Sequence, residues 1–167
     1  MPIRDPDQLF ELLCLEGAQA GLAWITILRK RESIRKEFDG FDPERLARWT
    51  PKRTAKALEN PGIIRSPKKI EAVIGNAQAY LGMLEAGEDF SAYCWSWVGG
   101  KPVNGKWTNF RQAPTYTAWS EAMSKDLKTR GFKFVGPTIV YAWAQAVGMV
   151  NDHEISCPRH REVRKHI

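Results

Sequence analysis

Residues 118–147 read AWSEAMSKDLKTRGFKFVGPTIVYAWAQAV, and this stretch decides the fold class. Its apolar spacing predicts one helix over residues 118–130 and a second over 137–147. Gly131 suits the left-handed backbone that often ends a helix. Pro137 suits the first position of the next helix, where the N–H that proline lacks would be unpaired anyway. The stretch therefore predicts two helices joined by a glycine hairpin.

Two interpretations of this hairpin stay open on spacing alone. Gly136 leaves the backbone N–H groups at the start of the second helix uncovered, and such groups bind phosphates. Positive charge around them comes from Lys125, Lys128, Arg130 and Lys133. One interpretation is a clamp for the DNA backbone, with no sequence preference, whose candidate contacts are Lys133, Val135, Gly136 and Thr138. The other is a plain helical hairpin with a solvated basic face.

Helix-start signals recur along the rest of the chain. A capping side chain stands directly before a proline at Asp5-Pro6, Asp42-Pro43, Thr50-Pro51 and Ser66-Pro67. Helical patterns follow each of these, begin again near Trp24, and cover about 89–98. Residues 99–117 are rich in glycine and proline and form a loop, and no strand pattern is convincing. The sequence predicts a single all-α domain over 1–167, a bundle of about seven or eight short helices.

Composition narrows the class of protein further. Lys and Arg outnumber Asp and Glu by 25 to 19, which gives a net charge of +6 and favours a polyanionic partner. The three cysteines, Cys14, Cys94 and Cys157, are widely spaced and fit a reducing compartment better than a disulfide framework. No apolar run has the length of a membrane span, and no leader pattern opens the chain. We expect a cytoplasmic monomer that is not attached to a membrane.

A lone carboxylate interrupts an apolar run in LCLEGAQAGLAW, residues 13–24. Glu16 is followed by a glycine-rich stretch that turns the chain, and Trp24 lies just beyond it. A carboxylate beside an aromatic face would attract a flat, positively charged group. The alternative is a core tryptophan and a solvated acid at the end of a helix.

His153 and Cys157 stand four residues apart, a spacing that places two metal ligands on one face of a helical turn. A structural zinc site needs four ligands, and no second pair is recognisable in the chain. From the residues alone, a surface histidine and an incidental cysteine are favoured.

Three long blocks of this sequence closely resemble the DNA-3-methyladenine glycosylase I family. They are LCLEGAQAGLAWITILRKRE, the GIIRSPKKIEAVIGNA block at 62–77, and SKDLKTRGFKFVGPTIVYAWAQAVGMVNDH, and the match runs from Pro2 to Cys157. The resemblance implies an all-α fold of the helix-hairpin-helix glycosylase superfamily. It therefore favours the clamp interpretation of residues 131–138 and implies alkylated double-stranded DNA as the partner.

The family hydrolyses the N-glycosidic bond of 3-methyladenine without cutting the DNA strand, and motif match carries its site residues to this chain. Glu16 corresponds to the carboxylate that contacts the flipped base, and Trp24 to an aromatic that stacks on it. Leu22 is the candidate wedge that fills the vacated space. Asp152 stands near the position where related glycosylases carry a catalytic aspartate, although its neighbours Asn151 and His153 suggest a structural role for this turn instead.

The sequence departs from the family pattern at its beginning. Members normally carry an earlier segment with a zinc-binding Cys and His, which would complete the site of His153 and Cys157, and with aromatics of the base pocket. We interpret the start as a shortened gene model in which Met1 takes the place of the family's Val before Pro. The alternative function is a catalytically impaired helix-hairpin-helix DNA-binding module, with weak zinc binding. The basic tail at residues 158–167 is either disordered or in contact with DNA.

Overall fold

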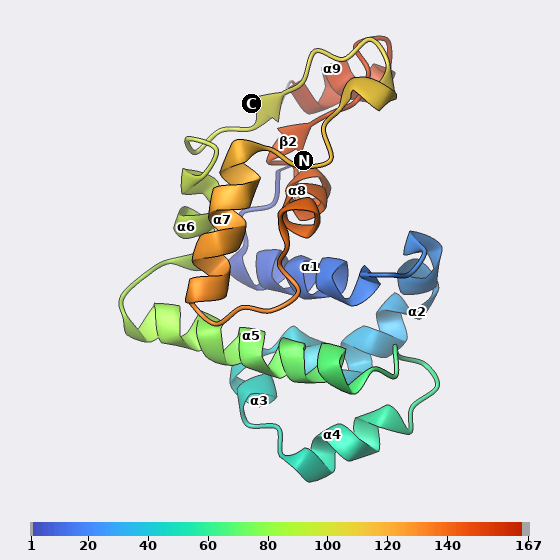
Figure 1. The fold of residues 1–167 in the computed structure, drawn as a ribbon, viewed down its shortest axis with the longest axis vertical. Helices are drawn as coiled ribbons and strands as arrows, with labels where there is room; N and C mark the ends of the chain where they lie inside the picture. The colour runs from blue at the N-terminus through green and yellow to red at the C-terminus, as the bar shows by residue number, and fades with distance from the viewer. Residues whose placement is uncertain (1, 165–167) are drawn as a thin grey trace.

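The computed structural model describes residues 2–164, and within them the fold is all-α, as predicted (Figure 1). Nine α-helices are present in this range, one or two more than expected. They are α1 (Pro6–Gln19), α2 (Trp24–Glu37), α3 (Pro43–Ala47), α4 (Pro51–Leu58), α5 (Pro67–Glu85), α6 (Phe90–Ser96), α7 (Ala118–Thr129), α8 (Pro137–Ala146) and α9 (Pro158–Arg164). Two short 3-10 turns, η1 (Asp39–Phe41) and η2 (Phe110–Gln112), complete the helical elements.

The four predicted proline-led starts are confirmed, each with its capping hydrogen bond. Asp5 accepts from the N–H of Gln8, and Thr50 accepts from that of Arg53. Asp42 and Ser66 cap α3 and α5 in the same way. These bonds satisfy donors that a helix leaves unpaired at its start, so local sequence alone sets these boundaries.

Helix α1 is the central element of the core. It lies across the middle of the molecule between α5 and α8 (Figure 1). The side chains of Leu9, Phe10, Leu13 and Leu15 are at most 1% exposed. Trp143 on α8 is fully buried, and its indole N–H donates to the carbonyl of Leu9. This packing fixes the direction of α1, at whose C-terminal end Glu16 lies.

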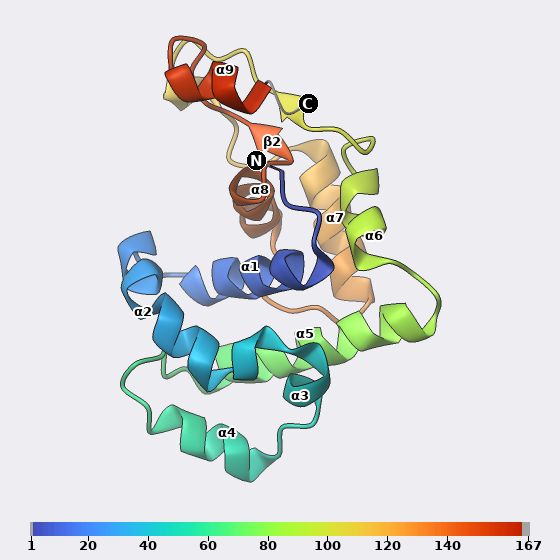
Figure 2. The same cartoon turned by 180° about the vertical axis from the view of Figure 1, so that it is seen from behind.

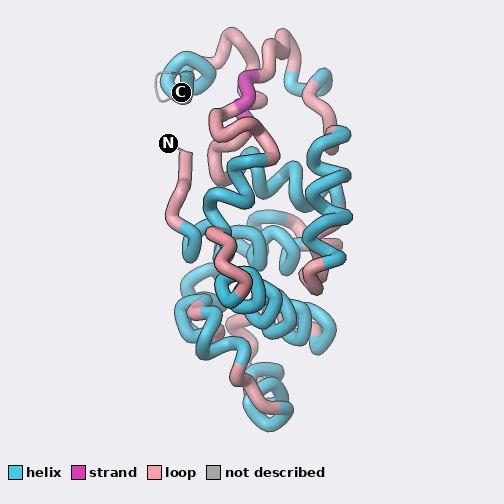
Figure 3. Tube along the Cα trace, turned by 90° about the vertical axis from the view of Figure 1, so that its left-hand side faces the viewer, coloured by secondary structure: helices cyan, strands magenta, loops and turns pink. Residues whose placement is uncertain are grey.

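The prediction that the chain has no strand was wrong by one short pair. β1 (Val103–Asn104), which lies within the 99–117 loop, pairs in parallel with β2 (Val150–Asn151) (Figure 3). Near them the N-terminal stretch runs past α8 (Figure 2), where the N–H of Ile3 donates to the carbonyl of Val147. These contacts join segments far apart in the sequence, so no local sequence pattern predicts them.

The described part of the basic tail, residues 158–164, forms helix α9. His160 in α9 is buried, and its ring Nε2 lies 3.0 Å from the carbonyl oxygen of Gly105. Asn151 donates to the backbone carbonyl of His160. Residues 165–167, the rest of that tail, lie outside the described range. Within residues 2–164, no helix has the length and apolarity to cross a membrane.

Candidate active site

Glu16 is a buried carboxylate with no counter-charge. It lies in the last turns of α1 with 7% of its surface exposed. Burial raises its pKa from 4.5 to about 7, because the charged form loses hydration and no neighbouring charge or donor compensates. Within residues 2–164 no ion pair or hydrogen bond reaches its side chain. Such a group favours a ligand that brings positive charge or N–H donors to it.

An exposed apolar corner follows Glu16 along the chain. Gly21 takes a positive φ of 78° and turns the backbone between α1 and α2. Leu22 is 38% exposed in this corner, and Trp24 is 37% exposed as the first residue of α2. Ile25 and Leu28 continue the exposed apolar surface along α2. Trp24 is therefore not the core tryptophan of the alternative interpretation, and both Leu22 and Trp24 are exposed at this corner.

Lys69 on α5 closes the other side of this corner. Its Nζ donates to the carbonyls of Ala18, at 2.8 Å, and Ala20, at 2.6 Å, at the end of α1. A cation there satisfies carbonyls that a helix leaves unpaired and complements the negative end of the helix dipole. Sequence reasoning missed this role, because nothing in the local pattern distinguishes Lys69 from the exposed Lys68 before it.

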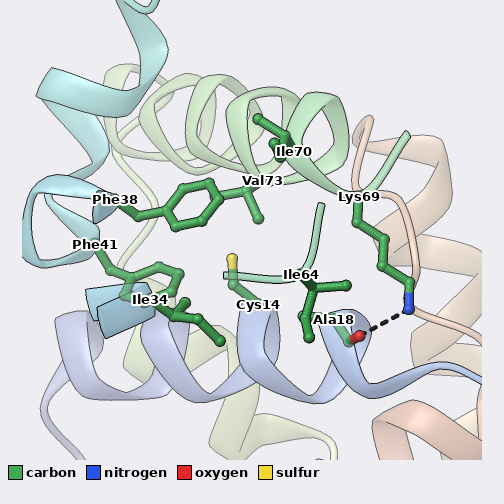
Figure 4. A pocket seen from close by; sticks show the side chains of 9 residues that line it. All are labelled: Cys14, Ala18, Ile34, Phe38, Phe41, Ile64, Lys69, Ile70 and Val73. Carbon is green, nitrogen blue, oxygen red and sulfur yellow. Dashed lines mark hydrogen bonds between the residues drawn. The ribbon is translucent and has the colours of Figure 1, made fainter. Parts of the chain in front are cut away.

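A small cavity lies between α1, α2 and α5 and is not the base pocket. Figure 4 shows its lining of Cys14, Ala18, Ile34, Phe38, Phe41, Ile64, Lys69, Ile70 and Val73. Its volume of about 20 Å³ is near that of one water and is too small for a purine. Burial also raises the pKa of Cys14 to about 12, so its thiol is unreactive. The cavity is a packing gap between α1, α2 and α5.

The turn between α7 and α8 contains the two glycine features expected from the sequence. Gly131 adopts a φ of 101°, directly after α7, and Gly136 begins α8 without any side-chain cap. Phe132 and Val135 are buried, which anchors the turn to the core. Lys133 and Thr138 point outward and are exposed. The N-terminal N–H groups of α8 are thus left without a capping side chain, beside a lysine.

The positive charge around the hairpin is smaller than the sequence suggested. Arg130 is held in ion pairs with Glu88 and Asp126, both at 2.6 Å, which raise its pKa further. Lys125 pairs with Glu121. Lys128 and Lys133 are exposed and make no ion pair within the described residues. Of the four predicted cations, these two are available to an anionic partner.

Asn76 on α5 holds the hairpin in place, a role that sequence reasoning missed. Its Oδ1 accepts from the N–H of Lys133 at 2.7 Å, and its Nδ2 donates to the carbonyl of the same residue at 3.2 Å. Ser124 donates to the carbonyl of Val135 at 2.6 Å. The available signal was a single asparagine inside the otherwise apolar stripe of a helix, where a polar side chain needs a partner.

The hairpin also touches the helix that carries Glu16. A Cβ added to Gly17 would lie 2.9 Å from the carbonyl oxygen of Phe134, closer than ordinary packing allows. Phe134 itself adopts a positive φ of 54°. Gly17 therefore permits α1 and the hairpin to meet at the residue that follows Glu16.

Asp152 is engaged in a structural network. Its carboxylate accepts from Trp107 Nε1 at 2.6 Å, from the Tyr141 hydroxyl at 2.6 Å and from Gln145 Nε2 at 2.9 Å. These bonds join the 99–117 loop to α8. Burial, and then the hydrogen bond to Asp152, raise the pKa of Tyr141. An acid with its oxygens so occupied is a poor base or nucleophile, so the geometry favours the structural role.

His153 and Cys157 do not gather a metal site from the described residues. His153 is exposed and Cys157 half-buried. No group of three or more His, Cys, Asp or Glu side chains within residues 2–164 is placed to hold a metal ion. The two residues thus do not fit a four-ligand zinc site on their own.

Known proteins are similar to nearly the whole of this chain. Residues 1–160 match the family model for methyladenine glycosylase. The DNA-3-methyladenine glycosylase of Haemophilus influenzae is 48% identical over 157 residues, covering 94% of this chain and 85% of that relative. A crystal structure of a 3-methyladenine DNA glycosylase I has a TM-score of 0.93 at 48% identity, over 95% of this chain and 87% of that one. The 3-methyladenine DNA glycosylase I of Staphylococcus aureus, solved to explain 3-methyladenine recognition, has a TM-score of 0.91 at 38% identity, over 95% and 84%. This chain belongs to the methyladenine glycosylase family.

Proposed function

We propose that this protein is a DNA glycosylase that removes 3-methyladenine from alkylated double-stranded DNA by hydrolysis and leaves the strand intact. The observation that carries the proposal is Glu16, a buried carboxylate without a counter-charge beside an exposed aromatic, in a member of this family. Methylation at N3 makes adenine cationic, so the damaged base supplies the positive counter-charge that no side chain supplies to Glu16. Undamaged adenine is neutral and gains much less from it.

The chemistry asks little of an acid catalyst, because a cationic base is already a good leaving group. The glycosidic C1′–N9 bond breaks with its electron pair going to the base, which leaves as neutral 3-methyladenine. Positive charge then develops on the sugar as an oxocarbenium ion. Water adds to C1′ and loses a proton to solvent, which gives the abasic sugar. The negative charge of Glu16 favours selection of the cationic base over its neutral counterparts, and it also stabilises the positive charge that develops on the nearby sugar.

The apolar corner supports extrusion of the base from the duplex. Unpairing and unstacking a nucleotide costs a few kcal/mol. Leu22, in the corner opened by Gly21, would fill the space that the base leaves in the stack. Trp24 would stack on the extruded cationic base, where cation–π attraction adds to apolar contact.

The hairpin supports binding of the DNA backbone. The N–H groups of Val135 and Gly136 and the hydroxyl of Thr138 lie at the start of α8, where a phosphate oxygen is favoured. The exposed Lys133 adds a charge contact. Such contacts bind any sequence, which suits an enzyme that must search undamaged DNA.

The alternative of a catalytically impaired binding module is not favoured. The high identity to named glycosylases extends through the Glu16 segment as well as the hairpin. Zinc binding by His153 and Cys157 stays a prediction, and elemental analysis of the purified protein tests it. One zinc per chain, lost in Cys157→Ser, would support it. A monomeric state and a cytoplasmic location likewise stay proposals, which sedimentation and fractionation would address.

The proposed role of Glu16 is tested by Glu16→Gln. We expect single-turnover release of 3-methyladenine from methylated DNA to fall at least ten-fold, with the Kd for undamaged duplex within two-fold of wild type. The matched control is Glu11→Gln, a second buried acid of α1 that is instead paired with Arg31 and Arg35. Equal release rates in wild type and Glu16→Gln would refute the assignment.

A further inference from the structure

Helix α5 presents two polar side chains on one face, Lys69 and Asn76, and each is bound to the backbone of a different part of the site. The two positions are seven residues apart, which is two helical turns and about 10 Å along the axis. We propose that Lys69 and Asn76 are positioning residues that fix the spacing between the α1–α2 corner and the α7–α8 hairpin. The inference deepens the proposed function, because that spacing joins the wedge to the phosphate contacts.

Asn76 determines the path of the hairpin. It is 3% exposed and makes both an accepting and a donating hydrogen bond to the backbone of Lys133. Because both bonds go to a single residue, they set the orientation of that peptide as well as its position. The next residue, Phe134, has a positive φ, which a phenylalanine rarely adopts without such constraint. Loss of Asn76 would release Lys133 and the start of α8 together.

Lys69 determines the path of the corner. Its ammonium binds the carbonyls on either side of Gln19, so it spans the point where α1 ends and the turn to α2 begins. Burial lowers the pKa of Lys69, yet the two carbonyls and the helix end favour its charged form. Loss of this cation would leave two carbonyls unpaired directly before Gly21 and Leu22.

Lys69 and Asn76 both line one small cavity where α1, α5 and the hairpin meet. The rest of its lining is Cys14, Gly17 and Ala18 of α1, Ala72 and Val73 of α5, and Phe134 of the hairpin. The close contact of Gly17 with Phe134 leaves little freedom between α1 and the hairpin. Extrusion of a base requires a wedge and phosphate contacts at a fixed separation, and a rigid support lowers the cost of reaching it. Helix α5 supplies that support from one face.

The test pairs each variant with a matched control. Lys69→Met is compared with Lys68→Met, which removes the same charge from the exposed neighbour. Asn76→Leu is compared with Asn60→Leu, because Asn60 also bonds to a backbone N–H, that of Gly62, in the turn before α5. Asn76→Ser replaces Asn76→Leu if the latter does not fold. Lys69→Arg tests whether a second cation restores the corner.

Two measurements separate the two roles without requiring chemistry. The Kd for undamaged duplex, measured as a function of salt, reports the hairpin. The fluorescence of 2-aminopurine beside a stable abasic analogue in duplex DNA reports insertion of the wedge. If wild type releases no 3-methyladenine, the proposed function fails, but both measurements still decide the positioning roles.

We expect Asn76→Leu to raise the Kd for undamaged duplex at least ten-fold and to reduce the salt slope by about one phosphate contact. We expect Lys69→Met to reduce the 2-aminopurine signal at saturation at least three-fold, with the Kd for undamaged duplex within two-fold of Lys68→Met, and Lys69→Arg to recover the signal. Variants that behave like their controls would overturn the proposal. It would also be overturned if each variant both weakened duplex binding and reduced the 2-aminopurine signal in parallel with a loss of Tm, since that pattern indicates general destabilisation.

Discussion

At the scale of single residues, burial of Glu16 lowers the free energy of unfolding when its carboxylate is charged. A carboxylate that is 7% exposed and has no partner within the described chain is retained at a cost in folding free energy. Glu11, buried on the same helix, shows the usual solution, since two arginines lie within 4 Å of it. The contrast between the two acids indicates that Glu16 serves a ligand rather than the core.

This cost makes stability depend on pH in a defined direction. The pKa of Glu16 is raised from 4.5 to about 7 on folding, so between these values the folded state binds more protons than the unfolded state. Stability is therefore highest below pH 4.5 with respect to this group and is lost as the pH rises through 7. Glu16→Gln removes the dependence, and we expect it to be more stable than wild type at pH 8 by up to about 3 kcal/mol.

Urea unfolding at pH 5 and pH 8 measures this difference. The advantage of Glu16→Gln should shrink markedly at pH 5, where Glu16 is mostly protonated in the folded protein. A difference that is the same at both pH values would show that the carboxylate is not desolvated as described.

Gly17 tests the close approach between α1 and the hairpin. A Cβ at this position would meet backbone atoms of Phe134, which cannot move without shifting the hairpin. We expect Gly17→Ala to lower stability by about 1 to 3 kcal/mol, despite the better helix propensity of alanine, and to weaken DNA binding. The control is Gly75→Ala in α5, where nothing lies within 4 Å and where propensity alone should raise stability by about 0.5 to 1 kcal/mol. Thermal unfolding of Gly17→Ala and Gly75→Ala measures both effects. A Tm of Gly17→Ala above that of wild type would contradict the close contact between Gly17 and Phe134.

At the scale of elements, the sequence predicted what local chemistry sets and missed what distant contacts set. The starts of α1, α3, α4 and α5 follow from capping side chains next to prolines and were predicted to the residue. The β1–β2 pair and α9 depend on partners such as Gly105 for His160, more than fifty residues away. Asn76 and Lys69 were missed for the same reason, because the backbone atoms that they bind are distant in sequence.

The Asp152 network is the clearest case of an element held by a single side chain. Three donors from the 99–117 loop and α8 converge on its carboxylate. An amide offers one acceptor oxygen in place of two, so we expect Asp152→Asn to lower stability by about 1 to 3 kcal/mol, or several degrees in Tm. Single-turnover base release by the folded variant should stay within a few-fold of wild type. A loss of release of a hundred-fold or more without a change in Tm would instead restore Asp152 to the catalytic role.

At the scale of the whole molecule, the excess of positive charge is spread over many side chains, and the structure limits which of them reach DNA. The net charge of +6 predicts attraction to a polyanion but not its position on the surface. Near the hairpin, Arg130 and Lys125 are neutralised by acids, whereas Lys133 lies exposed at the open start of α8. Local contacts, rather than total charge, should therefore govern affinity.

Salt dependence distinguishes these possibilities. Each phosphate neutralised by a protein cation contributes a slope of about −0.9 to the plot of log K against log salt concentration. We expect Lys133→Met to reduce the magnitude of the slope by about 0.9 and to weaken binding to methylated and undamaged duplex by the same factor, because a phosphate contact carries no information about the base. Lys125→Met removes the same formal charge from a lysine already paired with Glu121 and should leave the slope unchanged within error. If both variants reduced the slope equally, long-range charge would dominate DNA binding. The hairpin would then not be a specific binding site for the DNA backbone.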